Sequence, residues 1–313
     1  MEVKRRVAEA LVSKLSSVSD QTRTDALCEL RLMTKNDAES RPIIAEAGAI
    51  PYLTDIIYSP SPIQQENACA MLLNLSISVR QSLISTHGLL DALSHALNHP
   101  ASPAAFDSAA AALFSLLSVD DYRSVIGSKR DIIYALVKSI GDRSTPPRSV
   151  KDALRALFGI SLHPPNRKAV VELGAVPVLF SLVMKDGRVG IVEDATAVIA
   201  QVAGCEASIQ AFGKASGIRV LADLLDSATG SSERTKENAV AAFLNLVQHS
   251  GGVEEVKYAM GFGVLDGIEE VVEHGTEKGK LKALALLKAI DHQSRYSSAS
   301  RFDSSLQQNQ LSV

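Results

Sequence analysis

The sequence predicts an all-α superhelical solenoid, in which short helices stack along one axis instead of closing into a single globule. A three-part pattern recurs at intervals of 41 to 44 residues, and such a period is typical of repeat arrays. The chain has 313 residues, which is more than one compact core usually holds. Hydrophobic residues make up 46% of it and aromatic residues only 4%, which favours a long core of small aliphatic side chains between stacked helices.

An alanine that begins an apolar stretch marks the third helix of each repeat. In the copy ENACAMLLNLS, apolar residues recur at three- and four-residue spacing at Ala68, Leu72 and Leu75, which predicts a helix with one buried face. We call these alanines the marker alanines and expect their small side chains to let neighbouring helices approach closely. With successive spacings of 42, 41, 44, 42, 44 and 44 residues, they are Ala26, Ala68, Ala109, Ala153, Ala195, Ala239 and Ala283.

A glycine marks the junction between the first and second helices. Gly48, Gly88 and Gly174 lie in the related segments AEAGAIPYL, STHGLLDAL and VELGAVPVL, whereas the copy SKRDIIYAL lacks the glycine. Glycine readily takes the left-handed conformation that ends a helix. Pro51 and Pro177 follow in the first turn of the next helix, where a missing N–H costs nothing. Together these residues predict a sharp bend between the two helices.

A short apolar stretch upstream of each junction, such as SRPII, YRSVI or NRKAVV, completes a repeat of three helices. Turn-rich linkers such as 59–62 and 99–103 fall between the second and third helices. We therefore predict an N-terminal helical cap or partial repeat over residues 1–35, six repeats over residues 36–291 and a disordered, Ser- and Gln-rich tail over residues 292–313.

The runs AEAGAIPYL, ENACAMLLNLS, NRKAVVELGAVPVL and ENAVAAFLNL resemble armadillo repeats, and more narrowly the armadillo region of plant U-box ubiquitin ligases. The resemblance covers about residues 3–291 and implies a right-handed armadillo-repeat superhelical solenoid. In that family a U-box recruits the ubiquitin-conjugating enzyme, and the armadillo array recruits the substrate or a receptor kinase. A U-box needs roughly 70 residues of its own, at the low end for a folded domain. Only a short helix precedes the first repeat here, so we expect no ligase activity from this chain alone.

The resemblance also implies that the third helices line a concave groove, into which the residue six positions after each marker alanine points. In peptide-binding armadillo proteins an asparagine ladder at this position pairs with the backbone of an extended peptide, because an amide can donate and accept at once. Asn74 and Asn245 match that ladder, and Gln201 is a similar amide. The alternative is that these side chains only satisfy helix ends or solvent.

Arg155 lies two positions after its marker alanine, where nuclear-import receptors of this superfamily place tryptophan. The other repeats carry alanine or cysteine there, so import-signal binding is not expected. A lone cation in the groove could take an acidic or phosphorylated partner side chain in bidentate geometry. The alternative is a surface ion pair with Asp152 or Asp194. The predicted partner-binding residues are therefore Asn74, Ser115, Arg155, Gln201 and Asn245.

Composition argues against other ligands and places. The net charge of −3 offers no basic field for nucleic acid. The least polar stretch, 109–119, is too short to insert into a membrane, which takes about 20 apolar residues. Cys28, Cys69 and Cys205 are odd in number and lie within apolar helical patterns. No secretory signal is visible at the N-terminus, so we expect a cytoplasmic or nuclear protein.

No pattern in the sequence indicates a catalytic, metal or cofactor site. His95 and His99 stand one helical turn apart, but no third ligand of Cys, Asp or Glu type stands at a metal-site spacing. The glycines of 261–267 and of 275–280 lack the spacing of nucleotide-binding loops. We therefore expect a non-enzyme that needs no cofactor.

These observations lead to one hypothesis and its alternatives. The chain is expected to be a scaffold or adaptor that binds a partner protein or extended segment in its groove, in ubiquitin-linked or receptor-kinase signalling. The partner would be a ligase substrate, a receptor kinase or a ligase subunit. The first alternative is a component or short form of a U-box-type ligase that supplies its substrate-recognition part. A nuclear transport adaptor is disfavoured by the missing tryptophans.

The marker alanines give a direct test of the repeat pattern. Replacing Ala68 or Ala239 by leucine should overpack the contact between third helices and lower the free energy of unfolding by about 1–3 kcal/mol. Thermal melts of the two variants would measure this, and unchanged midpoints in both would refute the assignment.

Overall fold

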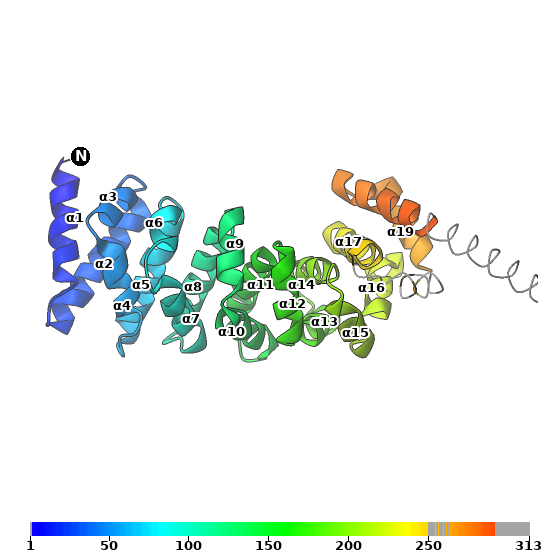
Figure 1. Ribbon diagram of the computed structural model, residues 1–313, viewed down its shortest axis with the longest axis horizontal. Helices are drawn as coiled ribbons and strands as arrows, with labels where there is room; N and C mark the ends of the chain where they lie inside the picture. The colour runs from blue at the N-terminus through cyan, green and yellow to red at the C-terminus, as the bar shows by residue number, and fades with distance from the viewer. Residues whose placement is uncertain are drawn as a thin grey trace, which may run out of the picture. The chain divides into compact units, whose positions relative to one another are not determined.

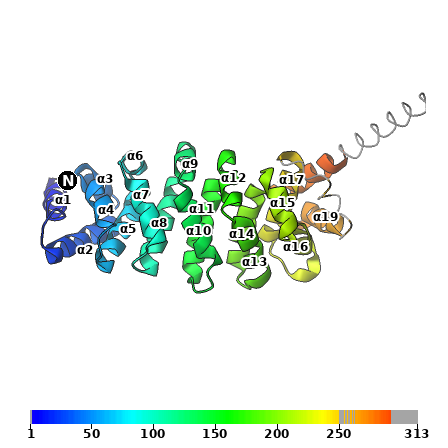
Figure 2. The same ribbon diagram turned by 60° about the horizontal axis from the view of Figure 1, so that its bottom comes forward.

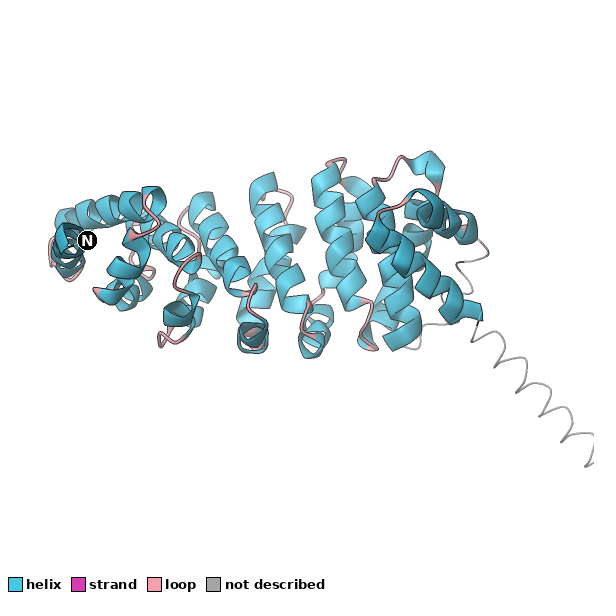
Figure 3. Ribbon diagram, turned by 90° about the horizontal axis from the view of Figure 1, so that it is seen from above, coloured by secondary structure: helices cyan, strands magenta, loops and turns pink. Residues whose placement is uncertain are grey.

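The computed structural model describes residues 2–249, 254, 256, 259, 261 and 263–291, and every regular element among them is helical. The described residues contain no strand, and short loops join the helices (Figure 3). The chain divides into two compact units, Met1–Leu173 and Gly174–Val313. Each unit is an all-α stack of armadillo-type helices, which confirms the predicted fold class within each unit.

The first unit begins with two long helices and continues with three sets of a short first helix, a second helix and a long third helix (Figure 1). It ends with one further first helix. Its helices are α1 (Glu2–Lys14), α2 (Asp20–Asn36), α3 (Ser40–Glu46), α4 (Ala49–Ile56), α5 (Pro62–Ser76), α6 (Arg80–Ile84), α7 (Leu89–Asn98), α8 (Pro103–Leu116), α9 (Asp120–Gly127), α10 (Arg130–Gly141), α11 (Pro147–Ser161) and α12 (Pro164–Glu172).

The second unit follows the same order, starting from a second helix. A further helix covers 277–291 and carries the last marker alanine. A short 3-10 helix, Ser227–Thr229, lies in one linker. The remaining helices are α13 (Ala175–Lys185), α14 (Val189–Val202), α15 (Ala207–Lys214), α16 (Gly217–Leu225), α17 (Glu233–His249) and α19 (Val264–His274).

Glycines make the bends between first and second helices as predicted. Gly48, Gly88 and Gly174 have φ angles of 86°, 78° and 85°, which is left-handed backbone that glycine adopts without a side-chain clash. In the copy KASGIRVL the left-handed residue is instead Ser216, with φ 52°. The neighbouring Gly217 serves packing, because a Cβ atom there would lie 2.4 Å from the ring of Phe180.

Prolines and serines set the start of the third helices. Pro62, Pro103 and Pro147 each occupy the first turn of a third helix, where the absent N–H would have had no intrahelical partner. The side chain of Ser102 caps α8 by accepting a hydrogen bond from Ala105 N. The turn-rich linkers therefore lie between second and third helices, as the sequence predicts.

The third helices form the core of each unit. In the first unit α2, α5, α8 and α11 pack in succession, and in the second unit α14 packs against α17. All seven marker alanines are at most 1% exposed. The first helices of the first unit, α3, α6, α9 and α12, follow one another along its upper edge in Figure 2.

Arginines of the first helices close the ends of the third helices. Arg41 Nε donates to Thr34 O at 2.8 Å, and Arg123 Nε donates to Leu117 O at 3.0 Å. Arg167 Nε donates to Ser161 O at 2.9 Å. The last carbonyls of a helix lack intrahelical donors and carry partial negative charge. A repeated cation at this point therefore satisfies both needs.

The predicted boundaries of cap, repeats and tail stay a prediction. The two helices α1 and α2 lie where the cap is expected, over residues 1–35. The predicted tail, 292–313, lies outside the described residues.

Gly127 and Asn166 interlock two neighbouring first helices. Asn166 is buried, and its Nδ2 donates to Arg123 O at 2.8 Å and to Ile160 O at 3.0 Å. A Cβ atom on Gly127 would lie 2.1 Å from that nitrogen. The glycine therefore leaves room for an amide that joins α9, α11 and α12.

We expect Gly127→Ala to lower the free energy of unfolding by about 1–3 kcal/mol, because the methyl group would push Asn166 off its two acceptors. Gly213→Ala is the matched control, since nothing lies within 4 Å of a Cβ atom in that helix. It should be neutral or stabilise by up to about 1 kcal/mol. Urea denaturation measures both, and equal effects of the two variants would contradict the interlock.

Candidate partner-binding face of the third helices

We call the outward sides of the third helices in each unit the third-helix face. In the first unit it carries Leu32, Asn74, Phe114, Ser115 and Arg155, and in the second Gln201 and Asn245. Asn74, Ser115, Gln201 and Asn245 are half-buried, whereas Arg155 is exposed. All of the predicted partner-binding residues therefore lie on third helices, and their role in binding stays a prediction.

In the first unit two residues at the sixth position, Asn74 and Ser115, hydrogen-bond to the preceding third helix. Asn74 Nδ2 donates to Thr34 Oγ1 at 3.1 Å. Ser115 Oγ donates to Ser76 O at 3.0 Å. Thr34 and Ser76 each lie eight residues after a marker alanine. The side chains thus join neighbouring helices near their C-terminal ends, where unpaired carbonyls need donors.

The same seam occurs elsewhere in two other forms. In the second unit Asn245 Nδ2 donates to Ala200 O at 2.7 Å. In α11 of the first unit the sixth position is the buried Gly159, and a Cβ atom there would lie 2.9 Å from Leu117 Cβ. The sixth position therefore points toward the preceding helix as well as outward, and the expectation that Gly159 points into a groove is not met.

Each amide of the ladder keeps one polar atom for a partner. Neither Asn74 Oδ1 nor Asn245 Oδ1 accepts a hydrogen bond from the residues that the structure describes. A carbonyl oxygen on a half-buried side chain can accept an N–H from an extended backbone. The helix-end interpretation thus accounts for the amide nitrogen of each asparagine and leaves the oxygen free to bind.

Two large apolar side chains are exposed on this face: Leu32 stands at a sixth position, as expected, whereas Phe114 was not predicted. Leu32 is 57% exposed and Phe114 is 41% exposed. Phe114 lies five residues after its marker alanine, at the end of the run SAAAALF. Phe114 could have been predicted because it is a large aromatic residue in an alanine-rich helix. The alanines are needed for close packing between helices, so a large ring there is expected to lie on the outward side. Cys28 is exposed on the same face.

Carboxylates form ion pairs with arginines on the third helices α8 and α11. Arg155 Nη1 lies 3.7 Å from Asp152 Oδ1, and Arg148 Nε lies 3.6 Å from Asp107 Oδ2. The Asp152 and Asp107 side chains are each only 13% exposed, while Arg155 is 46% exposed. The ion pair that was the alternative interpretation of Arg155 is therefore present.

Burial shapes the charge of Asp152. Removal from water raises the pKa of its carboxyl above 3.8, and the nearby Asp107 carboxylate raises it further. Arg155 and Arg148 act in the opposite direction and do not offset these two effects. Folding therefore disfavours the ionised form of Asp152.

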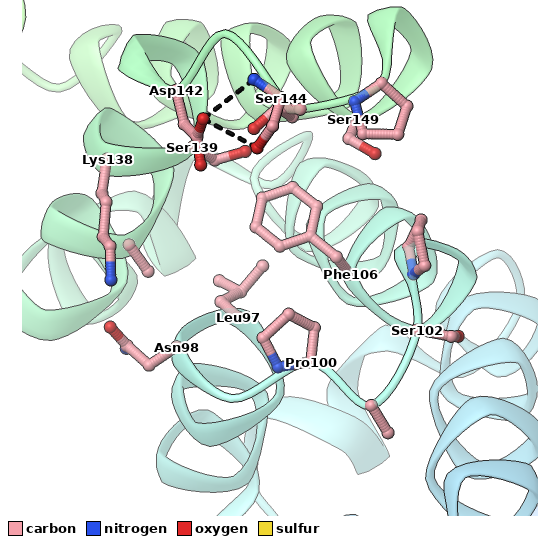
Figure 4. Close-up of a pocket in the computed structure, with 15 residues that line it drawn as sticks. Leu97, Asn98, Pro100, Ser102, Phe106, Lys138, Ser139, Asp142, Ser144 and Ser149 are labelled. Atoms are coloured by element: carbon pink, nitrogen blue, oxygen red, sulfur yellow. Dashed lines mark hydrogen bonds between the residues drawn. The ribbon is translucent and has the colours of Figure 1, made fainter.

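A second concave feature lies at the linkers of the first unit. A cavity of about 370 Å³ opens between the linker before α8 and the linker before α11. Figure 4 shows Leu97 and Phe106 at its floor and Lys138, Asn98 and Asp142 around its rim. Its volume is within the range of ligand pockets, and its position is distinct from the third-helix face.

The comparisons with known proteins decide the family. Residues 6–309 match the family described as the plant U-box protein ARM repeat region. The chain belongs to this family. The third-helix face is therefore part of an armadillo region of the kind found in plant U-box proteins.

The curated relatives in this family are U-box proteins from plants. U-box domain-containing protein 19 of Arabidopsis thaliana is 30% identical over 295 residues, which cover 92% of this chain and 43% of the relative. U-box domain-containing protein 1 of Medicago truncatula is 31% identical over 288 residues, which cover 92% and 41%. The chain thus spans about two fifths of the length of these relatives.

Solved structures agree on the armadillo fold. A designed armadillo repeat protein covers 90% of this chain and 99% of its own, with a TM-score of 0.52 and 22% identity. A second design, solved in complex with the peptide (KR)4, has a TM-score of 0.51 and 22% identity. An engineered protein reaches a TM-score of 0.79 at 24% identity, over 91% of this chain and 68% of its own.

Two features are absent from the described part of this armadillo chain. It holds no cluster of three or more His, Cys, Asp or Glu side chains placed to bind a metal. Among its helices none combines the length and apolar character needed to cross a bilayer.

The pKa of Asp152 gives a prediction with a defined sign. A carboxyl whose folded-state pKa is raised stabilises the fold most below about 3.8, and that contribution is lost as the pH rises through the folded value. Asp152→Asn should therefore unfold at nearly the same urea concentration as the parent at about pH 3.5 and at a higher concentration at about pH 6.5.

Asp142→Asn is the control of opposite sign. Hydrogen bonds from Ser144 N and Oγ lower the pKa of the Asp142 carboxyl, so its contribution is present above about 3.8 and is lost as the pH falls through the lower folded value. The variant should therefore be less stable than the parent at about pH 6.5. A shift of both variants in the same direction would contradict the assignment.

Proposed function

We propose that the chain is a non-catalytic scaffold that binds an extended segment of a partner protein along the third-helix face of one of its units. The observation that carries the proposal is the state of Asn74 and Asn245. Each amide nitrogen is held by the preceding helix at 3.1 and 2.7 Å. The orientation of each oxygen is thereby fixed before a partner arrives, which lowers the entropy cost of binding.

Neighbouring side chains suit a chain with mixed character. Phe114 and Leu32 supply exposed apolar surface of the kind that anchors protein interfaces. Arg155 supplies a planar cation that can hold an acidic or phosphorylated side chain in two parallel hydrogen bonds. Asp152 would then release a guanidinium that it holds only at 3.7 Å. The partner segment is therefore proposed to carry an acidic or phosphorylated group near an apolar residue.

The family supports a place in ubiquitin-linked or receptor-kinase signalling. The partner would be a ligase substrate, a receptor kinase or a ligase subunit, and the location would be cytoplasmic or nuclear. The second candidate is the substrate-recognition part of a U-box ligase, which the names of the relatives favour. Purified chain incubated with ubiquitin, activating enzyme, conjugating enzyme and ATP tests this point: the proposal expects no ubiquitin conjugates, and their formation would reject a scaffold role alone.

The chain offers a matched pair of exposed aromatic residues for mapping the partner. Phe114 lies on the third-helix face and is 41% exposed, and Tyr134 lies on the second helix α10 and is 50% exposed. A photoreactive phenylalanine analogue at position 114 should cross-link the partner in cell extract, and the same analogue at position 134 should not. Mass spectrometry of the cross-linked products measures the difference.

A charge variant completes the design. Arg155→Glu should reduce the yield at position 114 at least fivefold, while Lys168→Glu, which reverses a 71% exposed cation on α12, should leave it unchanged. Equal yields at positions 114 and 134, or equal effects of the two charge variants, would remove the third-helix face from consideration.

A further inference from the structure

Three aromatic rings fill the gap between two successive linkers at one interface of the first unit. The Tyr58 and His95 rings have centroids 4.7 Å apart, and the His95 and His99 rings 5.1 Å apart. Ring pairs at these distances attract one another in tilted or offset arrangements. Tyr58 lies in the linker after α4, His95 lies in α7, and His99 begins the linker after α7.

The next interface carries different side chains at the same three positions. Tyr58 and Asn98 each lie five residues after the leucine that ends the second marker, Leu53 or Leu93. Relative to Leu93 and Leu136 in the same way, His95 corresponds to Lys138, and His99 to Asp142. Three rings are thus replaced by an amide, an ammonium and a carboxylate. The cavity of about 370 Å³ is found at this second interface.

The third helices of the two interfaces also differ, at the residue that lies against the linker. Gln65 lies three residues before its marker alanine and bridges to the following linker, donating to His99 O at 3.2 Å and accepting from Ala101 N at 2.6 Å. The equivalent residue of α8 is Phe106, whose ring has no polar atom for such bonds. Instead it forms the floor of the cavity, together with the buried Leu97 and Ala135.

Two charged side chains, Asp142 and Lys138, lie at the rim of the cavity. Asp142 Oδ1 accepts hydrogen bonds from Ser144 N and Ser144 Oγ, both at 2.8 Å, as the dashed lines in Figure 4 show. Lys138 Nζ makes no hydrogen bond or ion pair with the described residues, and the side chain is exposed. Asn98 binds Ser94 O and Asp131 O through its amide nitrogen, which leaves its oxygen facing solvent or a ligand.

We propose that this cavity binds an aromatic side chain of a partner protein whose neighbouring residue is acidic. The ring would lie on Phe106 and Leu97, in the space that imidazole rings occupy at the preceding interface, where aromatic contact is favourable. The adjacent carboxylate would pair with Lys138, whose ammonium makes no hydrogen bond or ion pair with the described residues, although its charge also acts on the Asp142 carboxyl at the rim. The cavity is a second binding site, separate from the third-helix face and independent of the proposed function.

The test uses the full chain and a blocked peptide, acetyl-Gly-Ser-Asp-Phe-Asp-Ser-Gly-amide. Methyl NMR signals of Leu97 and Ala135 should shift on titration and yield a dissociation constant. Changing the phenylalanine of the peptide to alanine, or its two aspartates to lysines, should each weaken binding at least tenfold. Absence of methyl shifts at about 5 mM peptide, well above the concentration at which a useful anchor binds, would overturn the proposal.

Two variants of the chain tie the binding to this cavity. Ala101→Phe fills the cavity from an exposed linker residue and should weaken binding of the peptide at least tenfold. Lys138→Glu should favour the lysine-flanked peptide over the aspartate-flanked one, whereas Lys168→Glu should change nothing. Preference of the parent chain for the lysine-flanked peptide would assign the rim charge to Asp142 and reject the proposal. The third-helix variant Arg155→Glu should not affect this binding, so the failure of either proposal is recognisable on its own.

Discussion

Close approach of neighbouring third helices is the constraint on which the rest of this armadillo chain depends. The marker alanines are fully buried between those helices, and a larger side chain would force them apart. Only at this separation can Asn74 reach Thr34, and Asn245 reach Ala200 O. The polar seam and the surface offered to a partner therefore follow from the same small residues.

Many charged groups of the third helices already have partners within the chain, and this limits which groups a partner protein can bind. Arg41 and Arg123 bind carbonyls at the C-terminal ends, where the helix dipole is negative. Asp107 and Asp152 lie in the second turns of α8 and α11 and are paired with arginines. The groups left for recognition are the oxygens of Asn74 and Asn245 and the exposed apolar side chains of the third helices.

Much of the fold could be predicted from the sequence because each repeat marker has a local physical cause. The left-handed glycines at 48, 88 and 174 are examples. Contacts between repeats were harder to predict. The seam of Asn74 depends on which residue of the preceding helix lies opposite. The need for glycine at 217 depends on the ring of Phe180, which leaves no room for a Cβ atom. The ring stack of Tyr58, His95 and His99 joins residues from two repeats, and no spacing within one repeat reveals it.

Residue-resolved hydrogen exchange under native conditions tests most directly whether the third helices are the stable spine of the first unit. Amides in contact-rich core elements exchange only through large-scale unfolding, and those in peripheral elements exchange through local opening. The account predicts that the slowest amides lie in α5 and α8, which are packed between other third helices, and that α6 and α9 exchange faster. Slowest exchange in the first helices, or equal exchange in all of them, would contradict it.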